Sequence, residues 1–150
     1  MSLIPHLSEF FDGADVSHIA NLQELWSGYG SIARYRIDTN ISDKSDVQHY
    51  ANHSFFIIVK SIDPPSQQQH PRGWNSDRSH QRKLRSYQVE SHWYQQWASR
   101  CTPQSRAPHC FGVMDVSESH QCILLEDLDS NGFDQRHDEL TADQCVPCLR

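Results

Sequence analysis

The residues of this chain best suited to chemistry are a lysine, a glutamate and a short acidic segment that follows an apolar run. Lys60 ends the apolar run Phe55–Val59, and Glu90 lies further along in a helix-forming stretch. A second apolar run, 122–125, ends in Glu126-Asp127-Leu128. A phosphate needs a cation held in place, and a strand fixes the lysine stem while a carboxylate on a packed helix holds its ammonium group. The pattern therefore predicts that Lys60 and Glu90 meet at a site for a phosphorylated ligand.

Each of these residues also has an ordinary structural explanation. Strands often end in a lysine, most helical glutamates face water, and acidic loops commonly leave a sheet. The order along the chain favours the joint interpretation, because the lysine strand, the glutamate helix and the acidic segment follow one another.

A glycine-rich turn precedes these residues. Gly28-Tyr29-Gly30-Ser31 lies between two candidate strands, where a loop could cover phosphates. A two-glycine hairpin turn explains the same residues without a ligand. The chain has no G-x-x-x-x-G-K-[ST] motif, which excludes a P-loop.

Five basic side chains crowd the start of the helix that carries Glu90. Positive charge near a helix amino terminus is unfavourable, so we expect these groups to face an acidic partner or an anion. A solvated basic face is the competing explanation. The five are Arg78, His80, Arg82, Lys83 and Arg85.

Composition limits the class of protein. The chain has 150 residues and a net charge of −6, which argues against a general nucleic-acid binder. No apolar run approaches the roughly 18–20 residues of a membrane span, so we expect no membrane insertion and a cytoplasmic location. Hydrophobic content of 37% is low, which favours long polar loops or a face that meets another domain.

The cysteines indicate neither a disulfide framework nor a clear metal site. Their number, five, is odd, and Cys110 and Cys122 lie in or beside apolar strands as small core residues would. Cys145 and Cys148 form a single C-x-x-C without a second pair, so zinc or redox function is the weakest of the functional hypotheses.

Hydrophobic periodicity predicts an α+β fold. Residues 1–18 carry a short amphipathic helical pattern, 19–26 are ambiguous, and 32–38 alternate as a half-buried strand. After the Lys60 strand we expect one long helix, from about Ser79 to Ser99, and then a hairpin of two strands, 110–116 and 121–125. The sum is a sheet of about five antiparallel strands packed on one long helix.

With these residues together, the chain resembles the amino-terminal lobe of the aminoglycoside phosphotransferase and choline kinase superfamily. It is most similar there to the ecdysteroid kinase-like phosphotransferases. The stretches that carry the resemblance are 58–60, 70–75, 81–90 and 124–129, within a similarity that covers roughly residues 19–150. The resemblance implies a protein-kinase-like amino-terminal lobe, ATP and magnesium as cofactors, and transfer of phosphate to a hydroxyl group of a small molecule.

The resemblance also implies roles for individual residues. Lys60 would hold the α- and β-phosphates, Glu90 would orient Lys60, and residues 126–128 would carry adenine. It divides the chain into an amino-terminal helical extension at 1–18, a nucleotide-binding lobe at 19–125, and a hinge with the start of a second lobe at 126–150. The superfamily's catalytic aspartate and metal ligands belong to that second lobe, so we expect no catalytic residue or metal ligand here and interpret the chain as a truncated or partial kinase.

Two functional hypotheses therefore stand beside the weak zinc or redox one. The first is the nucleotide-binding lobe of an ATP-dependent small-molecule kinase. The second is a non-catalytic nucleotide-binding or interaction module. In either case we expect an exposed apolar surface where a second lobe would dock, and self-association through it.

Overall fold

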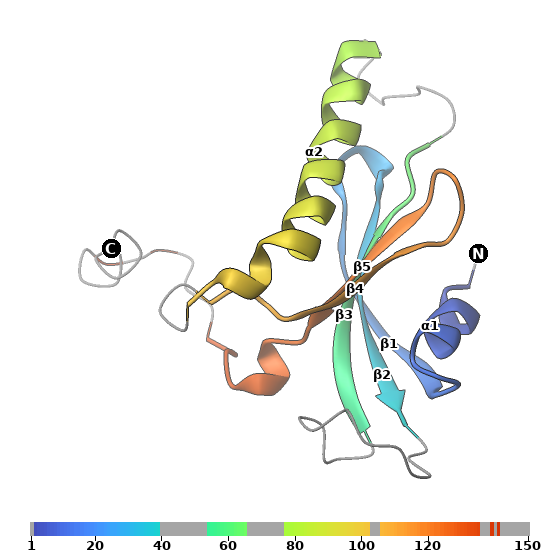
Figure 1. Ribbon diagram of the computed structural model, residues 1–150, viewed down its shortest axis with the longest axis vertical. Coiled ribbons are helices and arrows are strands. Elements are labelled where there is room, and N and C mark those ends of the chain that lie inside the picture. Colours follow the sequence, from blue (N-terminus) through green and yellow to red (C-terminus); the bar gives the residue numbers. More distant parts are fainter. Residues whose placement is uncertain are drawn as a thin grey trace.

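One antiparallel sheet organises the molecule. The computed structural model describes residues 2–39, 54–65, 77–102, 106–135, 139 and 141. The five strands lie in the order β1-β2-β3-β5-β4, and β3 is central (Figure 1). This confirms the predicted α+β class and the five-stranded antiparallel sheet. The strands are β1 (Asp15–Glu24), β2 (Gly30–Asp38), β3 (Ser54–Ile62), β4 (Cys110–Asp115) and β5 (Gln121–Glu126).

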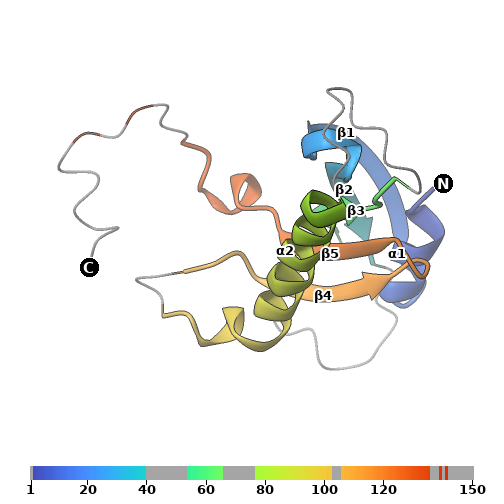
Figure 2. The same ribbon diagram turned by 90° about the horizontal axis from the view of Figure 1, so that it is seen from above.

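In the described part of the chain, two α-helices rather than one cover the sheet. The long helix α2 (Asp77–Gln96) lies across one face, and the short helix α1 (Ile4–Phe10) lies on the other side (Figure 2). The prediction of one long helix as the only packing layer is therefore incomplete. The described residues also form short 3₁₀ helices, which are η1 (Trp26–Gly28), η2 (Ala98–Arg100) and η4 (Asp129–Asn131).

The second layer exists because both faces of the central strands are apolar. In β3, Ile57 and Val59 pack with Leu7 of α1, while Ile58 and Ile62 pack on the α2 side. Successive side chains of a strand point to opposite faces, so a continuous apolar run requires cover on both. Among the described residues, α1 supplies that cover on one side.

Aromatic rings join α1 to the sheet. The ring of Phe11 lies 5.8 Å from that of Phe55 on β3 and 5.9 Å from that of Phe111 on β4. A Cβ built at Gly112 would lie 2.7 Å from the tip of the Phe10 ring, so that ring would have to shift to admit a side chain there. The amphipathic pattern predicted for the first residues thus belongs to a core-forming helix.

Element boundaries differ from the sequence prediction, most clearly in β1, which begins at Asp15 inside the predicted 1–18 helical extension, and at the end of the long helix. Residues 19–26, ambiguous by pattern, lie largely in β1, whose pairing with β2 shifts register between His18 and Ala20 and again between Asn21 and Gln23. Such bulges break the two-residue alternation that identifies a strand. The long helix ends at Gln96 rather than near Ser99, and η2 continues it. No helix in the described part of the chain is long and apolar enough to cross a membrane.

Candidate functional site

The predicted pairing of Lys60 and Glu90 is present. The Lys60 Nζ atom lies 2.7 Å from both carboxylate oxygens of Glu90. The Lys60 side chain is 16% exposed and that of Glu90 is 32% exposed, so water can still reach the carboxylate. Partial burial strengthens the attraction beyond that of a surface ion pair. The sheet and α2 thus hold a fixed ammonium group at the edge of solvent.

Both residues are positioned by packed elements. Lys60 sits on the central strand, opposite Ile32 of β2 and Ile123 of β5. The helix that carries Glu90 is anchored on the same face by Leu84, Tyr87 and Tyr94, which pack against the core there. The Lys60 ammonium also lies 5.4 Å from the centre of the Tyr87 ring. The helix face predicted from the sequence is therefore the one that packs, with Ser91 also buried.

The glycine turn joins β1 to β2 and is tied to the end of β3. Gly28 and Gly30 have φ angles of 71° and 135°, which side-chain-bearing residues rarely adopt. A Cβ at Gly30 would lie 1.9 Å from the Ser61 carbonyl oxygen, so only glycine fits against β3 there. The Asp63 amide also donates to the Tyr29 carbonyl at 2.9 Å.

Tyr29 is occupied by packing rather than free for a ligand. Its side chain is buried, and its hydroxyl lies 2.5 Å from Nδ1 of His80 at the start of α2. Its ring centre is 6.2 Å from that of Tyr87. Burial raises the pKa of Tyr29. Of the predicted loop residues, Tyr29 therefore connects the turn to the helix.

Glu126 forms a structural clamp at the end of β5. Its buried carboxylate accepts hydrogen bonds from the His109 amide at 2.9 Å, from the Asn131 side chain at 2.7 Å and from the Arg106 guanidinium. Burial alone would raise the pKa of Glu126, but these hydrogen bonds and the Arg106 charge outweigh it, and the pKa is lowered. The side chain thus fixes the chain before β4 to the turn after β5.

Asp127 and Leu128 also make polar contacts within the protein. Asp127 is 2% exposed, and its carboxylate pairs with Arg34 of β2 at 2.8 Å. The Leu128 carbonyl accepts from the amides of Asn131 and Phe133, at 3.1 and 3.0 Å. That carbonyl is therefore already used by the turn that follows, whereas the resemblance implies that residues 126–128 carry adenine.

A cavity of about 290 Å³ lies beside this segment, on the same face as Lys60. Its walls come from β1, β2, β3, the end of β5 and the following turn, and it lies near the lower end of the roughly 300–1,000 Å³ of ligand pockets. Arg34 and Ile58 face each other across β2 and β3 and line it together. We call it the hinge cavity. It is lined by Leu22, Arg34, Ile58, Pro108, Leu125, Glu126, Asp127, Leu128, Asp129 and Phe133.

Arg34 is a residue of this cavity that the sequence did not identify. Its guanidinium pairs with Asp127 and, at 2.8 Å, with Asp129. Burial would lower the pKa of Arg34, but the hydrogen bonds and charges of these two carboxylates raise it. The strand alternation placed Arg34 on the polar side of β2, but nothing local pointed to carboxylates more than ninety residues away.

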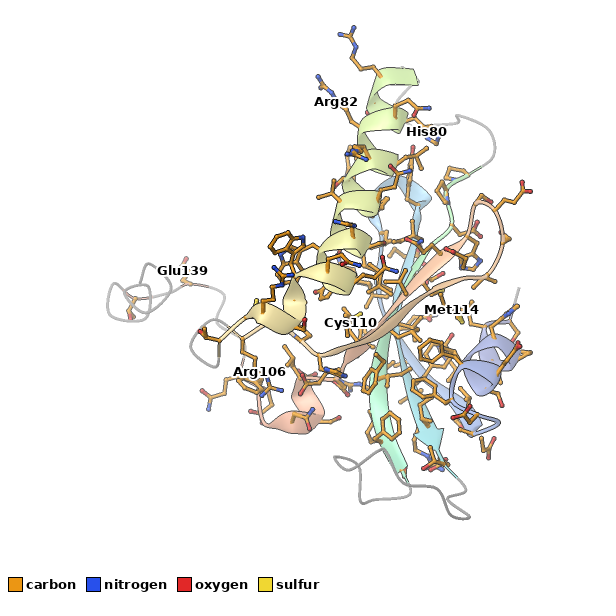
Figure 3. The ribbon with its side chains drawn as sticks, viewed as in Figure 1. His80, Arg82, Arg106, Cys110, Met114 and Glu139 are labelled. Carbon is orange, nitrogen blue, oxygen red and sulfur yellow. The ribbon has the colours of Figure 1, made fainter. Side chains whose placement is uncertain are left out.

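The predicted basic cluster divides into two groups. His80 and Lys83 turn inward, where His80 meets Tyr29 and the Lys83 ammonium lies 4.0 Å from the Trp26 ring and 4.5 Å from that of Tyr29. Arg82 points away from the sheet, on the opposite side of α2 from His80 (Figure 3). Arg78 and Arg85 are exposed like Arg82.

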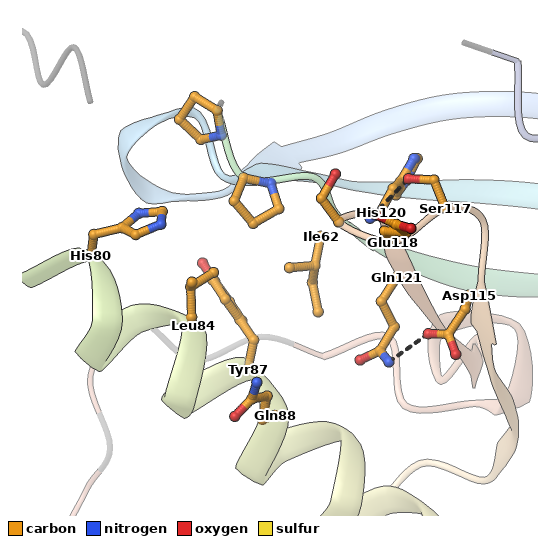
Figure 4. Close-up of a pocket in the computed structure, with 13 residues that line it drawn as sticks. Ile62, His80, Leu84, Tyr87, Gln88, Asp115, Ser117, Glu118, His120 and Gln121 are labelled. Atoms are coloured by element: carbon orange, nitrogen blue, oxygen red, sulfur yellow. Dashed lines mark hydrogen bonds between the residues drawn. The ribbon is translucent and has the colours of Figure 1, made fainter. Parts of the chain in front are cut away.

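A second cavity of about 420 Å³ lies between the start of α2, the end of β3 and the β4–β5 turn (Figure 4). Tyr87 and Gln121 stand on its two sides, and the Gln121 side chain donates to Asp115 at 2.8 Å. His120 lines it from a buried position and hydrogen-bonds Ser61 at 2.7 Å. These polar groups are paired within the protein.

The cysteines that the structure describes are free. Cys122 is buried in the core, where burial raises the pKa of its thiol to about 11, and Cys110 packs against the core on the α2 side. Both behave as the predicted small core residues. Cys145 and Cys148 lie outside the described residues, as does the predicted 70–75 stretch. In the described part of the chain, no three His, Cys, Asp or Glu side chains gather as a metal site.

Searches of protein-family models, of curated proteins and of solved structures found no match to this chain.

Proposed function

We propose that this chain is the nucleotide-binding lobe of an ATP-dependent phosphotransferase that acts on a hydroxyl group of a small molecule. The observation that carries the proposal is the bidentate pairing of Lys60 with Glu90. In protein kinases a lysine of the third strand pairs with a glutamate of the following helix, and the lysine contacts the nucleotide phosphates. Here the lysine also lies on the third strand and the glutamate on the helix that follows.

The placement of the glycine turn supports the same function. It joins the first two strands, and β2 and β3 pair from Gly30 opposite Ile62 through Ile32 opposite Lys60. The turn therefore lies a few residues from the lysine along the sheet. A glycine-rich turn leaves backbone amides accessible to phosphate oxygens because no side chain covers them.

The hinge cavity is the proposed position of the base. Ile58 and Leu125 supply apolar walls, and the cavity opens on the face that carries Lys60. Arg34 would then border the base, and a guanidinium held by two carboxylates offers a planar surface for stacking. Magnesium, when bound with ATP, would neutralise phosphate charge. This chain's own part is to hold the phosphates through Lys60 and to orient Lys60 through Glu90.

The second candidate is the interaction form of the non-catalytic nucleotide-binding or interaction module. Arg34 favours this candidate, because its ion pairs with Asp127 and Asp129 place charged groups along one wall of the hinge cavity. In that case the Lys60–Glu90 pair would stabilise the packing of α2 on the sheet. The two candidates differ in whether ATP binds at this face.

Calorimetric titration of the full chain with Mg-ATP separates them. We expect binding that weakens about tenfold or more in Lys60→Ala, because a charge-assisted contact contributes about 1.5–3 kcal/mol. Arg36→Ala is the matched control. It removes a positive charge from β2 on the face of the sheet that also carries Lys60, and this charge pairs with Asp38. Equal ATP affinity in wild type and Lys60→Ala, or no binding by either, would contradict the proposed function.

A further inference from the structure

The outer face of α2 carries a stripe of arginine and apolar side chains. We call it the outer stripe, and its members recur every three or four residues, which places them on one side of a helix. All are exposed, and they lie away from the side that packs on the sheet. The outer stripe consists of Arg78, Arg82, Arg85, Val89 and Trp93 of α2 and of Trp97, the residue that follows its end.

The apolar half of the stripe is unusually accessible. Val89 is 53% exposed, Trp93 37% and Trp97 50%. Tryptophan and arginine are the residue types most enriched among the side chains that dominate binding at protein interfaces. Three large apolar side chains in a row on an exposed helix therefore point to a contact surface rather than to a solvated face.

The basic half of the stripe has no charge partner among the residues that the structure describes. The chain carries a net charge of −6, yet none of the ion pairs among the described residues involves Arg78, Arg82 or Arg85. Of these arginines, Arg78 stands in the first turn of α2, where positive charge is disfavoured by the helix dipole. A guanidinium can instead be stabilised over an aromatic ring, and this chain uses that contact where Arg100 lies 4.5 Å from the Trp97 ring.

The stripe is complementary to itself. Arg85 and Trp93 are each one turn from Val89, on opposite sides of it along the helix. Two copies of α2 that cross antiparallel at Val89 would bring Arg85 of each copy to Trp93 of the other. Arg82 and Trp97 would meet in the same way further out. A two-fold interface requires such matching of a surface with its own copy.

We propose that two copies of this chain associate through the outer stripe of α2, antiparallel and with Val89 at the two-fold axis. The arginine clusters then lie at opposite ends of the contact, about 20 Å apart at 1.5 Å per residue. That separation is about twice the Debye length at physiological salt, so their repulsion is screened. The inference does not rest on the proposed function, because neither Lys60 nor the hinge cavity takes part.

The expected association is weak. A single helix pair buries less than the roughly 800 Å² per partner of a standard stable interface. Sedimentation velocity of the full chain should therefore show a monomer at low concentration and a growing dimer fraction across an about hundredfold rise in concentration. A chain that stays monomeric over the whole range would overturn the proposal.

An exchange of the two facing residues tests the geometry. Trp93→Arg should weaken dimerisation about tenfold or more, because the change occurs twice and sets Arg85 of each copy against an arginine of the other. The double variant R85W/W93R should recover to within about threefold of wild type, since every arginine again faces a tryptophan. Gln95→Ala, exposed on α2 but off the stripe, is the control and should dimerise normally. A double variant no better than Trp93→Arg alone, or a Trp93→Arg variant that dimerises as wild type does, would show that another surface or crossing is used.

Discussion

Lys60 and Glu90 depend on each other at the level of single residues. Their 2.7 Å contacts hold the ammonium group at the position that we propose for a nucleotide phosphate. We expect Glu90→Gln to weaken Mg-ATP binding about as much as Lys60→Ala does, and the double variant to lose little more, because the two residues act as a unit. The measurement is a double-mutant cycle of ATP dissociation constants. Fully additive losses would show that Glu90 does not act through Lys60.

Glu126 makes a separate prediction about pH. Its pKa is lowered in the folded protein, so its stabilising contribution is present above its ordinary pKa, which is about 4.3. That contribution is lost as the pH falls through the lowered, folded-state pKa. Glu126→Gln should cost about 1–3 kcal/mol of unfolding free energy at pH 7. The difference between variant and wild type should shrink below about pH 4, as urea unfolding across pH can show. A difference that is constant from pH 3 to 7 would contradict the role assigned to the carboxylate charge.

At the level of elements, the β1–β2 turn depends on one of its two glycines far more than on the other. Gly30→Ala should destabilise the protein by more than about 3 kcal/mol, because its Cβ would meet the Ser61 carbonyl oxygen and its φ angle is unfavourable. Gly28→Ala, which also has a positive φ but meets open space, should cost about 1–2 kcal/mol. Thermal or urea unfolding of both variants measures the difference. Similar losses at the two positions would mean that the turn is not pressed against β3.

The helix α1 should contribute to the core and not behave as a detachable extension. Leu7 is fully buried, so Leu7→Ala should cost about 2–5 kcal/mol of unfolding free energy. Ile4 in the same helix is 37% exposed and serves as the control, with an expected loss of about 1 kcal/mol or less for Ile4→Ala. If Leu7→Ala unfolds as wild type does, α1 does not pack on the sheet in solution.

Sequence patterns identified the elements whose signal is local. The apolar run of β3, the strand 32–38 and the inner face of α2 follow from periodicity, and each packs as predicted. The Lys60–Glu90 pairing could be predicted because a helix that covers a strand brings their facing residues together. The features that could not be predicted depend on contacts between residues distant in the sequence or on irregular strand pairing. Two register shifts break the alternation that would identify β1 as a strand. Arg34 of β2 pairs with carboxylates that are distant in the sequence.

For the whole molecule, we expect nucleotide binding without efficient turnover. In the proposed function, Lys60 and the glycine turn would position a nucleotide but supply no group to orient an acceptor hydroxyl. Of the acidic residues after β5, Asp127 and Asp129 pair with Arg34. Purified residues 1–150 with Mg-ATP should therefore phosphorylate none of a panel of amino-alcohol, sugar and sterol acceptors at a useful rate. A phosphorylated product that disappears in Lys60→Ala would show that catalytic groups are present in this chain.

The most direct test of the central claim is where ATP binds. Amide NMR spectra of the full chain, recorded during titration with Mg-ATP, report every backbone position at once. The account predicts saturable shifts at Gly30, Lys60 and Leu128, which mark the turn, the lysine and the hinge cavity, and predicts their loss in Lys60→Ala. Shifts confined to the cavity around His80 and His120, or none up to millimolar ATP, would contradict the nucleotide site.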